Sequence, residues 1–430
     1  MIQTYILDNG LRIVASPSAT DVVYCGIAVD AGTRDELPGE EGIAHFTEHL
    51  SFKGTTHRKA WHILNRMETV GGDLNAFTGK EETVYYSTFL RPHFARAVDL
   101  LVDVVFNSVY PQQEMDKEVE VVIDEIESYN DSPADLIFDE FENNIFQGHA
   151  LGHAILGEAD GLRRMKSADV QRFVNRLYRP DRMVLYVLGN IPMKQIVREV
   201  QKALRRSELL RDFDSSNLPH FESSSQRGNA SPVQLLLRQP PTVYTPSHQV
   251  AHKDTHQAHV MMGVRSFSAT DPRHLHLYVL NNMLGGPGMN SRLNLALRER
   301  NGLVYTVESA SVCYTDTGLW TVYFGCDPHD VKRCQKLVLR ELDKLTSAPL
   351  SSSALATVKR QLIGQIGISY DSFESMAINM GKRYLHYNTT QTCEQLCQRV
   401  NDLTADDLYR TACQLFVPEN ISTLVYEQYN

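Results

Sequence analysis

The sequence lacks several features that would assign a protein to a class at once. None of its apolar runs is long enough to cross a bilayer, and no run of Lys and Arg is available to bind a phosphate backbone. The net charge of −10 at neutral pH also argues against nucleic acid as a partner. The first ten residues contain no charged segment followed by an apolar core, so no signal peptide is predicted.

Cysteine is scarce and shows no pattern. The seven cysteines are an odd number, and no two of them form a Cys-x-x-Cys pair. Free thiols in a reducing compartment are therefore expected rather than a disulfide framework. Together with the missing signal peptide, this predicts a cytoplasmic protein that is not bound to a membrane.

The composition is that of a large globular protein. The chain has 430 residues, of which 42% are hydrophobic and 22% are charged. This length is too great for one compact core and predicts at least two domains. The stretch 207–232 is rich in Ser, Asp and Asn and has little periodicity, so we interpret it as a linker. It would join an N-terminal domain, 1–206, to a C-terminal domain, 233–430.

The two halves share local patterns at nearly one spacing. Leu-Tyr-Arg-Pro at 177–180 and Leu-Phe-Val-Pro at 415–418 are 238 positions apart, and each precedes a short apolar segment. Pro92 and Pro328, each followed by His after a strand-like run, are 236 positions apart. These pairs indicate duplication of one unit. We predict an α+β protein with two related domains, each a mixed, largely antiparallel sheet packed with helices.

The segment 42–50 contains the residues best suited to catalysis. His45, Glu48 and His49 lie at positions i, i+3 and i+4 of a helix expected over 42–52, so they share one face. Two imidazoles one turn apart can bind a single zinc ion, although two helical histidines are also common as packing or surface residues. Zinc lowers the pKa of its bound water to about 7, and Glu48 can accept the water proton and pass it to the leaving amine. The order His-x-x-Glu-His is the inverted zinc-peptidase motif.

A third zinc ligand is expected from an acidic helix over 111–129. Its candidate carboxylates are Glu114, Asp116, Glu118, Glu120, Asp124, Glu125 and Glu127. Spacing alone does not choose among them. Glu118 and Glu125 are seven positions apart and therefore lie on one stripe of the helix. Val121, Val122 and Ile126 are expected nearer the packing side.

Other histidines have ligand-like spacing in less suitable surroundings. His248, His252, His256 and His259 fall in or near a segment that alternates like a strand. His149 and His153 lie in a glycine-rich stretch that we interpret as a loop. We expect no metal at either place.

At this point the sequence resembles the pitrilysin family of zinc peptidases, which includes insulin-degrading enzyme and mitochondrial processing peptidase. The resemblance, to the short two-domain type, covers essentially the whole chain and rests on His45-Phe-Thr-Glu48-His49-Leu-Ser-Phe-Lys-Gly-Thr55. In the family the third ligand follows the second histidine by 76 residues, which implies Glu125 here. A supporting glutamate seven residues earlier implies Glu118, and the site implies one Zn²⁺ per chain.

Two further stretches resemble the substrate elements of this family. The stretch with Asn75, Ala76 and Phe77 is similar to the strand on which an extended peptide adds to the sheet edge. Arg298 and Tyr305, seven positions apart, are similar to a pair that is believed to bind the substrate backbone and to stabilise the oxyanion. The resemblance therefore implies substrate-binding roles for all five residues.

The resemblance implies a metalloendopeptidase that hydrolyses unfolded peptides or oligopeptides in an enclosed chamber. Family chambers contain four such units, so a two-unit chain implies a dimer. Because the zinc motif and the Arg298–Tyr305 pair lie on one chain, we expect a homodimer in which the pair of one protomer completes the zinc site of the other. The alternative is a non-catalytic subunit or scaffold of a peptidase-like complex, which the retained Glu48 disfavours. Processing of leader peptides and general degradation are both compatible with the sequence.

Overall fold

The computed structural model describes residues 2–207, 238–241 and 243–428, so the expected linker lies outside the described residues except for Ser207. Within these limits the chain forms two compact units. Unit 1 contains residues 2–126, 153–207 and 370–391, and unit 2 contains residues 127–152, 238–369 and 392–428. The units are thus not the continuous stretches 1–206 and 233–430, because each includes a segment from the other half of the chain.

Unit 1 is built on a six-stranded sheet with the order β1-β2-β6-β3-β5-β4. Its strands are β1 (Gln3–Ile6), β2 (Arg12–Ser16), β3 (Val22–Val29), β4 (Asn75–Thr78), β5 (Thr83–Leu90) and β6 (Met183–Leu188). Only β2 and β6 run parallel, and the other pairs are antiparallel. The hairpin β1–β2 turns at Asn9-Gly10, where the positive φ of Gly10 (87°) suits glycine, as the sequence predicts.

Unit 2 repeats this topology in a five-stranded sheet with the order β7-β11-β8-β10-β9. Its strands are β7 (His248–His252), β8 (Ala258–Ser266), β9 (Val304–Cys313), β10 (Gly318–Cys326) and β11 (Ser422–Glu427). Again one pair, β7 with β11, is parallel and the rest are antiparallel. Chain order matches β7 to β2, β8 to β3, β9 to β4, β10 to β5 and β11 to β6. The predicted α+β fold with two related units is therefore confirmed.

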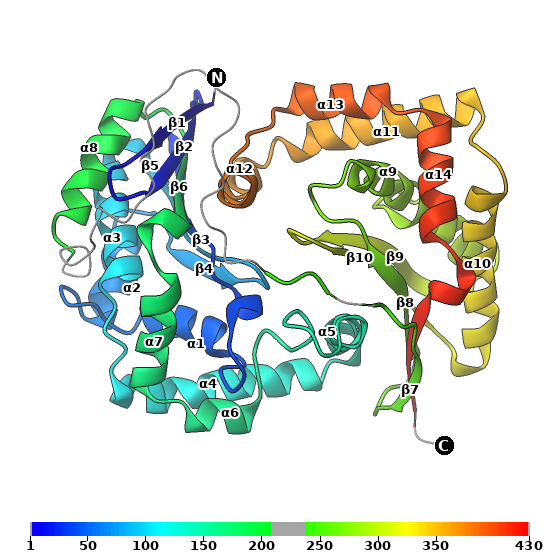
Figure 1. The fold of residues 1–430 in the computed structure, drawn as a ribbon, viewed down its shortest axis with the longest axis horizontal. Helices are drawn as coiled ribbons and strands as arrows, with labels where there is room; N and C mark the ends of the chain where they lie inside the picture. Colours follow the sequence, from blue (N-terminus) through cyan, green and yellow to red (C-terminus); the bar gives the residue numbers. More distant parts are fainter. Residues whose placement is uncertain (1, 208–237, 242, 429–430) are drawn as a thin grey trace. The chain divides into compact units, whose positions relative to one another are not determined.

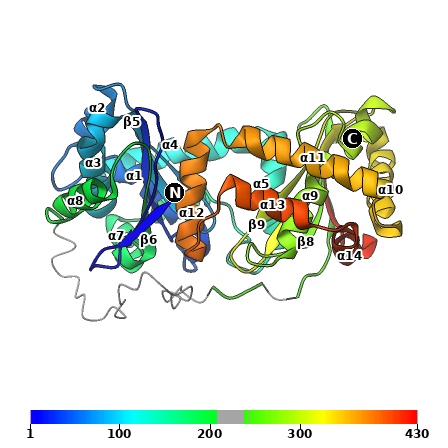
Figure 2. The same cartoon turned by 90° about the horizontal axis from the view of Figure 1, so that it is seen from above.

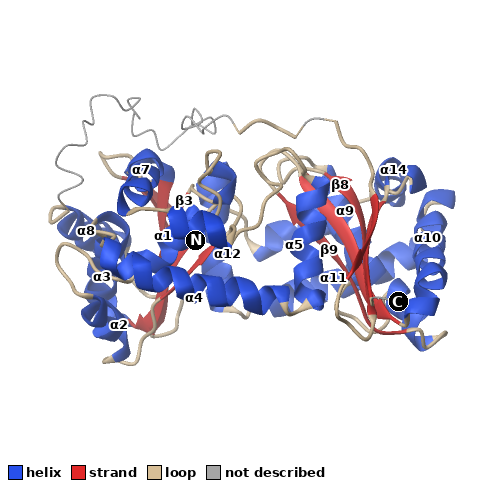
Figure 3. Ribbon diagram, turned by 90° about the horizontal axis from the view of Figure 1, so that it is seen from below, coloured by secondary structure: helices blue, strands red, loops and turns tan. Residues whose placement is uncertain are grey.

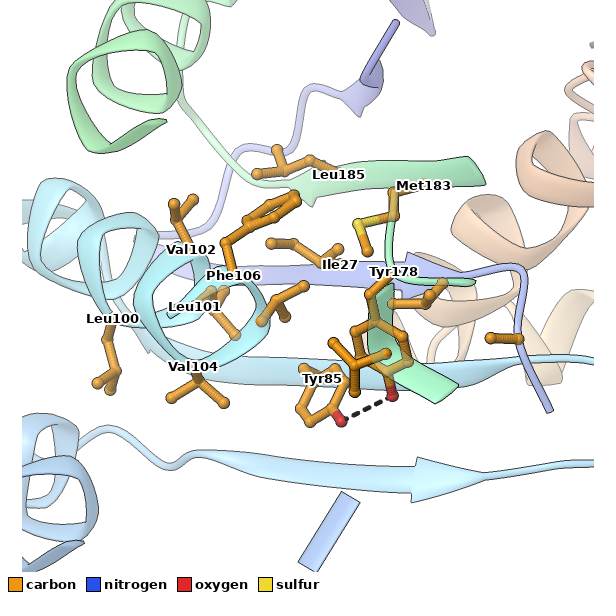
Figure 4. Close-up of a cluster of buried hydrophobic side chains, with 14 of the residues drawn as sticks. Ile27, Tyr85, Leu100, Leu101, Val102, Val104, Phe106, Tyr178, Met183 and Leu185 are labelled. Carbon is orange, nitrogen blue, oxygen red and sulfur yellow. Dashed lines mark hydrogen bonds between the residues drawn. The ribbon is translucent and has the colours of Figure 1, made fainter. Parts of the chain in front are cut away.

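Helices cover both faces of the sheet in unit 1. They are α1 (Ile43–Ser51), α2 (Ala60–Glu68), α3 (Phe94–Phe106), the first part of α4 (Gln112–Asn130), α6 (Ala159–Arg164), α7 (Ser167–Leu177), α8 (Met193–Leu204) and α12 (Phe373–Tyr387). Figure 1 and Figure 2 show α3 and α8 on one side of the strands and α12 on the other. The core beneath α3 is dense and apolar, and Figure 4 shows the hydroxyls of Tyr85 and Tyr178 within it, 3.1 Å apart.

Unit 2 is covered in the same way. Its helices are α5 (Pro133–Ile145), α9 (Arg273–Gly285), α10 (Val331–Ser347), α11 (Ser352–Ser369), α13 (Cys393–Asp402) and α14 (Ala405–Leu415), with a short π-helical segment at Asn294–Glu299. α5 lies on one side of the sheet, and α10 and α14 lie on the other (Figure 3). In each unit, one face of the sheet is thus covered by a helix from the opposite half of the chain, α12 in unit 1 and α5 in unit 2.

One packing prediction is wrong. Val121 of α4 is 51% exposed, whereas Val122 is fully buried. The buried stripe of α4 includes Met115, Val119, Val122 and Ile123, and position 121 is turned well away from it at about 100° per residue.

All seven cysteines are free thiols. Among the described residues, none of the helices combines the length and the apolar character needed to span a membrane.

Candidate metal centre

The helix α1 presents His45, Glu48 and His49 on one face. The ring centroids of the two histidines are 4.6 Å apart. Phe46 and Leu50, on the other side of α1, are fully buried in the core of unit 1. Because this apolar side is anchored, the rotation of α1 about its axis is set by packing, and the two imidazoles are held next to each other.

Glu125 of α4 completes a group of three possible metal ligands. Its Oε2 atom is 3.6 Å from Nε2 of His49 and 3.9 Å from Nε2 of His45. One ligand atom from each residue lies within 4.8 Å of the others. Around a tetrahedral zinc ion with bonds of about 2.0–2.1 Å, ligand atoms are about 3.4 Å apart. Small side-chain adjustments would therefore let all three bind one ion.

Glu118 holds His49 in the orientation that such a site needs. Its Oε1 atom is 3.0 Å from Nδ1 of His49, and its Oε2 atom is 2.5 Å from Nζ of Lys53. Burial acts to raise the pKa of Glu118, but the contacts with His49 and Lys53 outweigh it and lower the pKa. In the neutral imidazole, an Nδ1–H that donates to this carboxylate leaves the lone pair on Nε2, the atom 3.6 Å from Oε2 of Glu125.

His45 is buried and uncharged. Burial, and then the neighbouring His49, lower the pKa of His45 to about 3. A neutral imidazole is the form that binds a metal. The Nδ1 atom of His45 is also buried without a hydrogen-bond partner. Two imidazoles and one carboxylate are a ligand set of catalytic zinc sites, and Glu125, with a side chain 36% exposed, leaves one side open. The residues present therefore fit zinc.

Glu48 lies beside these ligands without being one of them. Its Oε2 atom accepts a hydrogen bond from Oγ1 of Thr78 at 2.5 Å. Burial raises the pKa of Glu48 even though this hydrogen bond acts to lower it. A carboxylate with a raised pKa is a better proton acceptor near neutral pH. No role for Thr78 is predicted from the sequence, where its only signal is its position directly after Asn75, Ala76 and Phe77.

The strand β4 contains Asn75, Ala76 and Phe77 and lies at the edge of its sheet. It pairs with β5, where Ala76 lies opposite Tyr85, and among the described residues no strand pairs with its other edge. Asn75 is exposed, and Ala76 and Phe77 are partly exposed. The next residue, Thr78, contacts Glu48. An accessible strand edge is thus connected directly to the proposed base.

The structure also brings Arg298 and Tyr305 together, within unit 2. Arg298 lies in the π-helical segment and Tyr305 lies near the start of β9, the edge strand of the second sheet. The Arg298 guanidinium is 5.5 Å from the centroid of the Tyr305 ring, a cation–π contact. Tyr305 is 79% exposed, so its hydroxyl faces solvent rather than a core.

The remaining histidines make separate contacts. Nδ1 of His248 is 3.0 Å from Oγ1 of Thr423, whereas Nδ1 of His259 is 2.9 Å from the hydroxyl of Tyr323. Other contacts join His149 to the backbone of unit 2, and His153 to Glu36 in unit 1. Among the described residues, the one other ligand-like group is Asp327, His329 and Asp330, on an exposed turn.

Known protein families and relatives match this chain over nearly its whole length. The family model for insulinase (peptidase family M16) matches residues 12–159, and the model for the peptidase M16 inactive domain matches residues 164–362. The chain is 32% identical over 426 residues to the uncharacterized zinc protease YmxG of Bacillus subtilis, covering 99% of this chain and 98% of that protein. It is 32% identical over 408 residues to an uncharacterized zinc protease of Streptomyces coelicolor, covering 94% of this chain and 85% of that protein.

Solved structures agree in fold. A protease from Helicobacter pylori superposes with a TM-score of 0.85 at 22% identity, covering 99% of both chains. A structure from Pseudomonas fluorescens, described as a peptidase M16 inactive domain, superposes with a TM-score of 0.86 at 17% identity, covering 100% of this chain and 98% of that one. At these identities the similarity concerns the fold alone.

Proposed function

The chain belongs to the insulinase family of peptidases, family M16, and we propose that it is a zinc-dependent endopeptidase. The observation that carries the proposal is the meeting of His45, His49 and Glu125 next to Glu48, a buried carboxylate that is not needed as a ligand. A structural metal site would have no use for a proton acceptor at that place. The relatives named zinc proteases support the choice of metal.

Each residue of the site has a distinct part in this proposal. His45, His49 and Glu125 would hold one Zn²⁺ per chain, and Glu118 orients His49. When bound, zinc would supply a Lewis acid that acidifies water and polarises a carbonyl group. Glu48 accepts a proton from the attacking water and donates it to the leaving amine.

Substrate recognition is proposed at the edge of β4. An extended peptide would pair with the backbone of Asn75, Ala76 and Phe77, and its scissile bond would then lie near Glu48, which Thr78 connects to the same strand. Main-chain pairing is available only to a segment without its own secondary structure. The substrate class is therefore unfolded peptides or oligopeptides, and an enclosed chamber would restrict their size.

The decisive experiment compares the wild-type protein with Glu48→Gln, using metal analysis and a library of quenched fluorogenic peptides. We expect about one zinc per chain in both proteins, and a fall in kcat of at least about 10²-fold in the variant, because general acid–base catalysis is worth that much. Thr47→Ser is a matched control on the adjacent residue, which is fully buried. Full zinc without wild-type activity would indicate a scaffold or a missing partner, and the absence of zinc would refute the proposal.

We also propose that two copies of the chain cooperate. Arg298 and Tyr305 are assembled and exposed on unit 2, so they are available to a peptide held at the zinc site of a second copy. Mixing a Glu48→Gln protomer with a Tyr305→Phe protomer tests this arrangement. In each mixed dimer one of the two shared sites would then be intact, and activity should exceed that of either variant alone. A mixture without any gain, in a sample shown to be dimeric by light scattering, would refute sharing between protomers.

A further inference from the structure

The N-terminus of α1 is capped by the side chain of a residue that lies outside the helix. Gly42 occupies the N-cap position and has no side chain to accept a hydrogen bond. Instead, the carboxylate of Glu36 accepts the backbone N–H of Gly42 at 3.0 Å and that of Ala44 at 2.9 Å. These are two of the N–H groups that have no partner inside the helix. Ala44 immediately precedes His45, so the capped turn is the turn that carries the first expected zinc ligand.

A second segment fixes Glu36 in place. Nε2 of His153 is 2.8 Å from Oε2 of Glu36, whose side chain is only 1% exposed. The backbone oxygen of His153 in turn accepts a hydrogen bond from the ammonium of Lys80. Glu36 therefore binds the start of α1 on one side and the loop before α6 on the other.

The backbone of the same loop packs directly against the backbone at the start of α1. A Cβ atom on Gly42 would lie 2.7 Å from the carbonyl oxygen of Leu156, and one on Gly157 would lie 2.5 Å from the carbonyl oxygen of Glu41. Both glycines have positive φ angles, 91° and 70°, which other residues rarely adopt. This close approach leaves the beginning of α1 little freedom to shift.

We propose that Glu36 and His153 act as positioning residues that set the first turn of α1 and thereby the metal affinity of the site. The inference rests on the proposed zinc-dependent function. His49 is held by Glu118, but His45, at the third position of α1, has no hydrogen bond of its own at Nδ1. Its position depends on the turn that Glu36 caps. If that turn frays, only the fraction of molecules with an ordered turn binds metal tightly, and the apparent affinity falls by that fraction.

The test compares variants of this cap in the full chain, with zinc and with Co²⁺ as a spectroscopic substitute. Glu36→Gln keeps the shape but places an NH₂ group against N–H donors, so zinc should bind about tenfold more weakly, the usual size of a lost charged cap. The visible Co²⁺ bands should change, and at saturating zinc kcat should fall while KM stays nearly constant. Glu41→Gln is the matched control, because Glu41 accepts hydrogen bonds from the exposed N–H of Gly39, which lies outside α1.

His153 provides a second, milder test that does not depend on the folding of the Glu36 variant. His153→Ala should weaken zinc binding about threefold, and His153→Gln, whose amide can donate to Glu36, should restore it. The proposal is overturned if Glu36→Gln and His153→Ala lower the melting temperature but keep wild-type zinc affinity and Co²⁺ bands. A wild-type protein that binds neither metal would instead refute the proposed function itself.

Discussion

The two units share one scaffold but differ in whether their described residues include a partly buried group of possible metal ligands. Chain order places α9 of unit 2 where unit 1 has α1, and α11 where unit 1 has α4. α11 contains no Asp or Glu between Ser352 and Ser369, whereas α4 carries both Glu118 and Glu125. In α9, Nδ1 of His276 is 2.8 Å from the hydroxyl of Thr411 instead of facing a second imidazole. The sheets are alike, so a few side chains rather than the fold determine the chemistry.

Unit 2 has a different pair of residues in the corresponding region. Arg298 lies in the π-helical segment before β9 and Tyr305 lies in β9 itself, where unit 1 has α2 and β4. Under the proposed function, metal binding belongs to unit 1 alone, whereas substrate is bound by β4 of unit 1 and by Arg298 and Tyr305 of unit 2. Each of the following predictions tests this division or extends it.

The largest effect is expected from removing a ligand. His45→Gln should abolish zinc binding, because the two remaining ligands, His49 and Glu125, cannot form a three-ligand site. His276→Gln makes the same change in the equivalent helix of unit 2 and should leave the zinc content near one per chain. Elemental analysis after dialysis measures both. Loss of zinc from the His276 variant, or its retention in the His45 variant, would contradict the division between the units.

A smaller effect is expected from Tyr305→Phe. Removing one donor to a developing oxyanion costs about 10²–10³-fold in catalysis, so kcat/KM should fall by about 10²-fold. The zinc content should not change, because Tyr305 belongs to unit 2. Tyr278→Phe removes a hydroxyl from a partly exposed tyrosine of α9 and serves as the control. Equal activity of the two variants would show that the hydroxyl of Tyr305 has no part in the reaction.

The two helices that cover the sheet of the opposite half of the chain, α12 and α5, offer another comparison. In both units an arginine donates to carbonyl groups at the helix C-terminus: Arg12 to Tyr384 of α12 at 3.0 Å, and Arg265 to Ile145 of α5 at 2.8 Å. α12 adds a buried ionic cluster, in which Glu82 lies 2.5 Å from Nζ of Lys382 and 2.9 Å from Nε2 of His386.

This cluster predicts that the contribution of α12 to the free energy of unfolding depends on pH, whereas that of α5 should not. Burial acts to raise the pKa of Glu82, but His386 and Lys382 together lower it to about 2. A carboxyl whose pKa is lowered on folding contributes stability above its unfolded pKa of about 4.3, and this contribution is lost as pH falls toward 2. Relative to Glu82→Gln, the wild type should therefore gain about 3 kcal/mol near pH 6 and almost nothing near pH 2.

Urea unfolding followed by circular dichroism at several pH values measures this difference. Glu140→Gln is the control in unit 2, because Glu140 pairs with Lys253 at 3.2 Å and its side chain is 38% exposed. Its effect should stay below about 1 kcal/mol, as for other exposed pairs. A constant gap between the wild type and Glu82→Gln across this pH range would show that the cluster is not ionised as described.

Local patterns predicted the local structure well. The turn at Asn9-Gly10, the strand pair 74–78 with 83–90, and the face shared by His45, Glu48 and His49 follow from short-range spacing, and the structure contains all three. The convergence of Glu125 with this face needed the family resemblance, because seven carboxylates on one helix leave the choice open to spacing alone.

Long-range partners could not be predicted in the same way. Periodicity indicates which side of α5 or α12 is buried, but not which sheet it covers, and both helices cover the sheet of the opposite half. The contact between Glu36 and His153, 117 positions apart, could not be predicted either, because neither residue has a sequence signature of capping. The prediction that Val121 is buried was wrong for a related reason, since the rotation of α4 is set by residues far from it in sequence.

The smallest effect concerns this rotation of α4, the helix that carries Glu125. Val122→Ala should lower the free energy of unfolding by about 1–3 kcal/mol, because two buried methyl groups are removed from the core of unit 1. Val121→Ala, one position along, should change it by less than about 0.5 kcal/mol, because the side chain is half exposed. In unit 2 the equivalent contrast is Leu362→Ala, which is buried, against Ile368→Ala, which is exposed. Equal losses at positions 121 and 122 would mean that α4 is rotated from the described orientation, and Glu125 would then face away from His45 and His49.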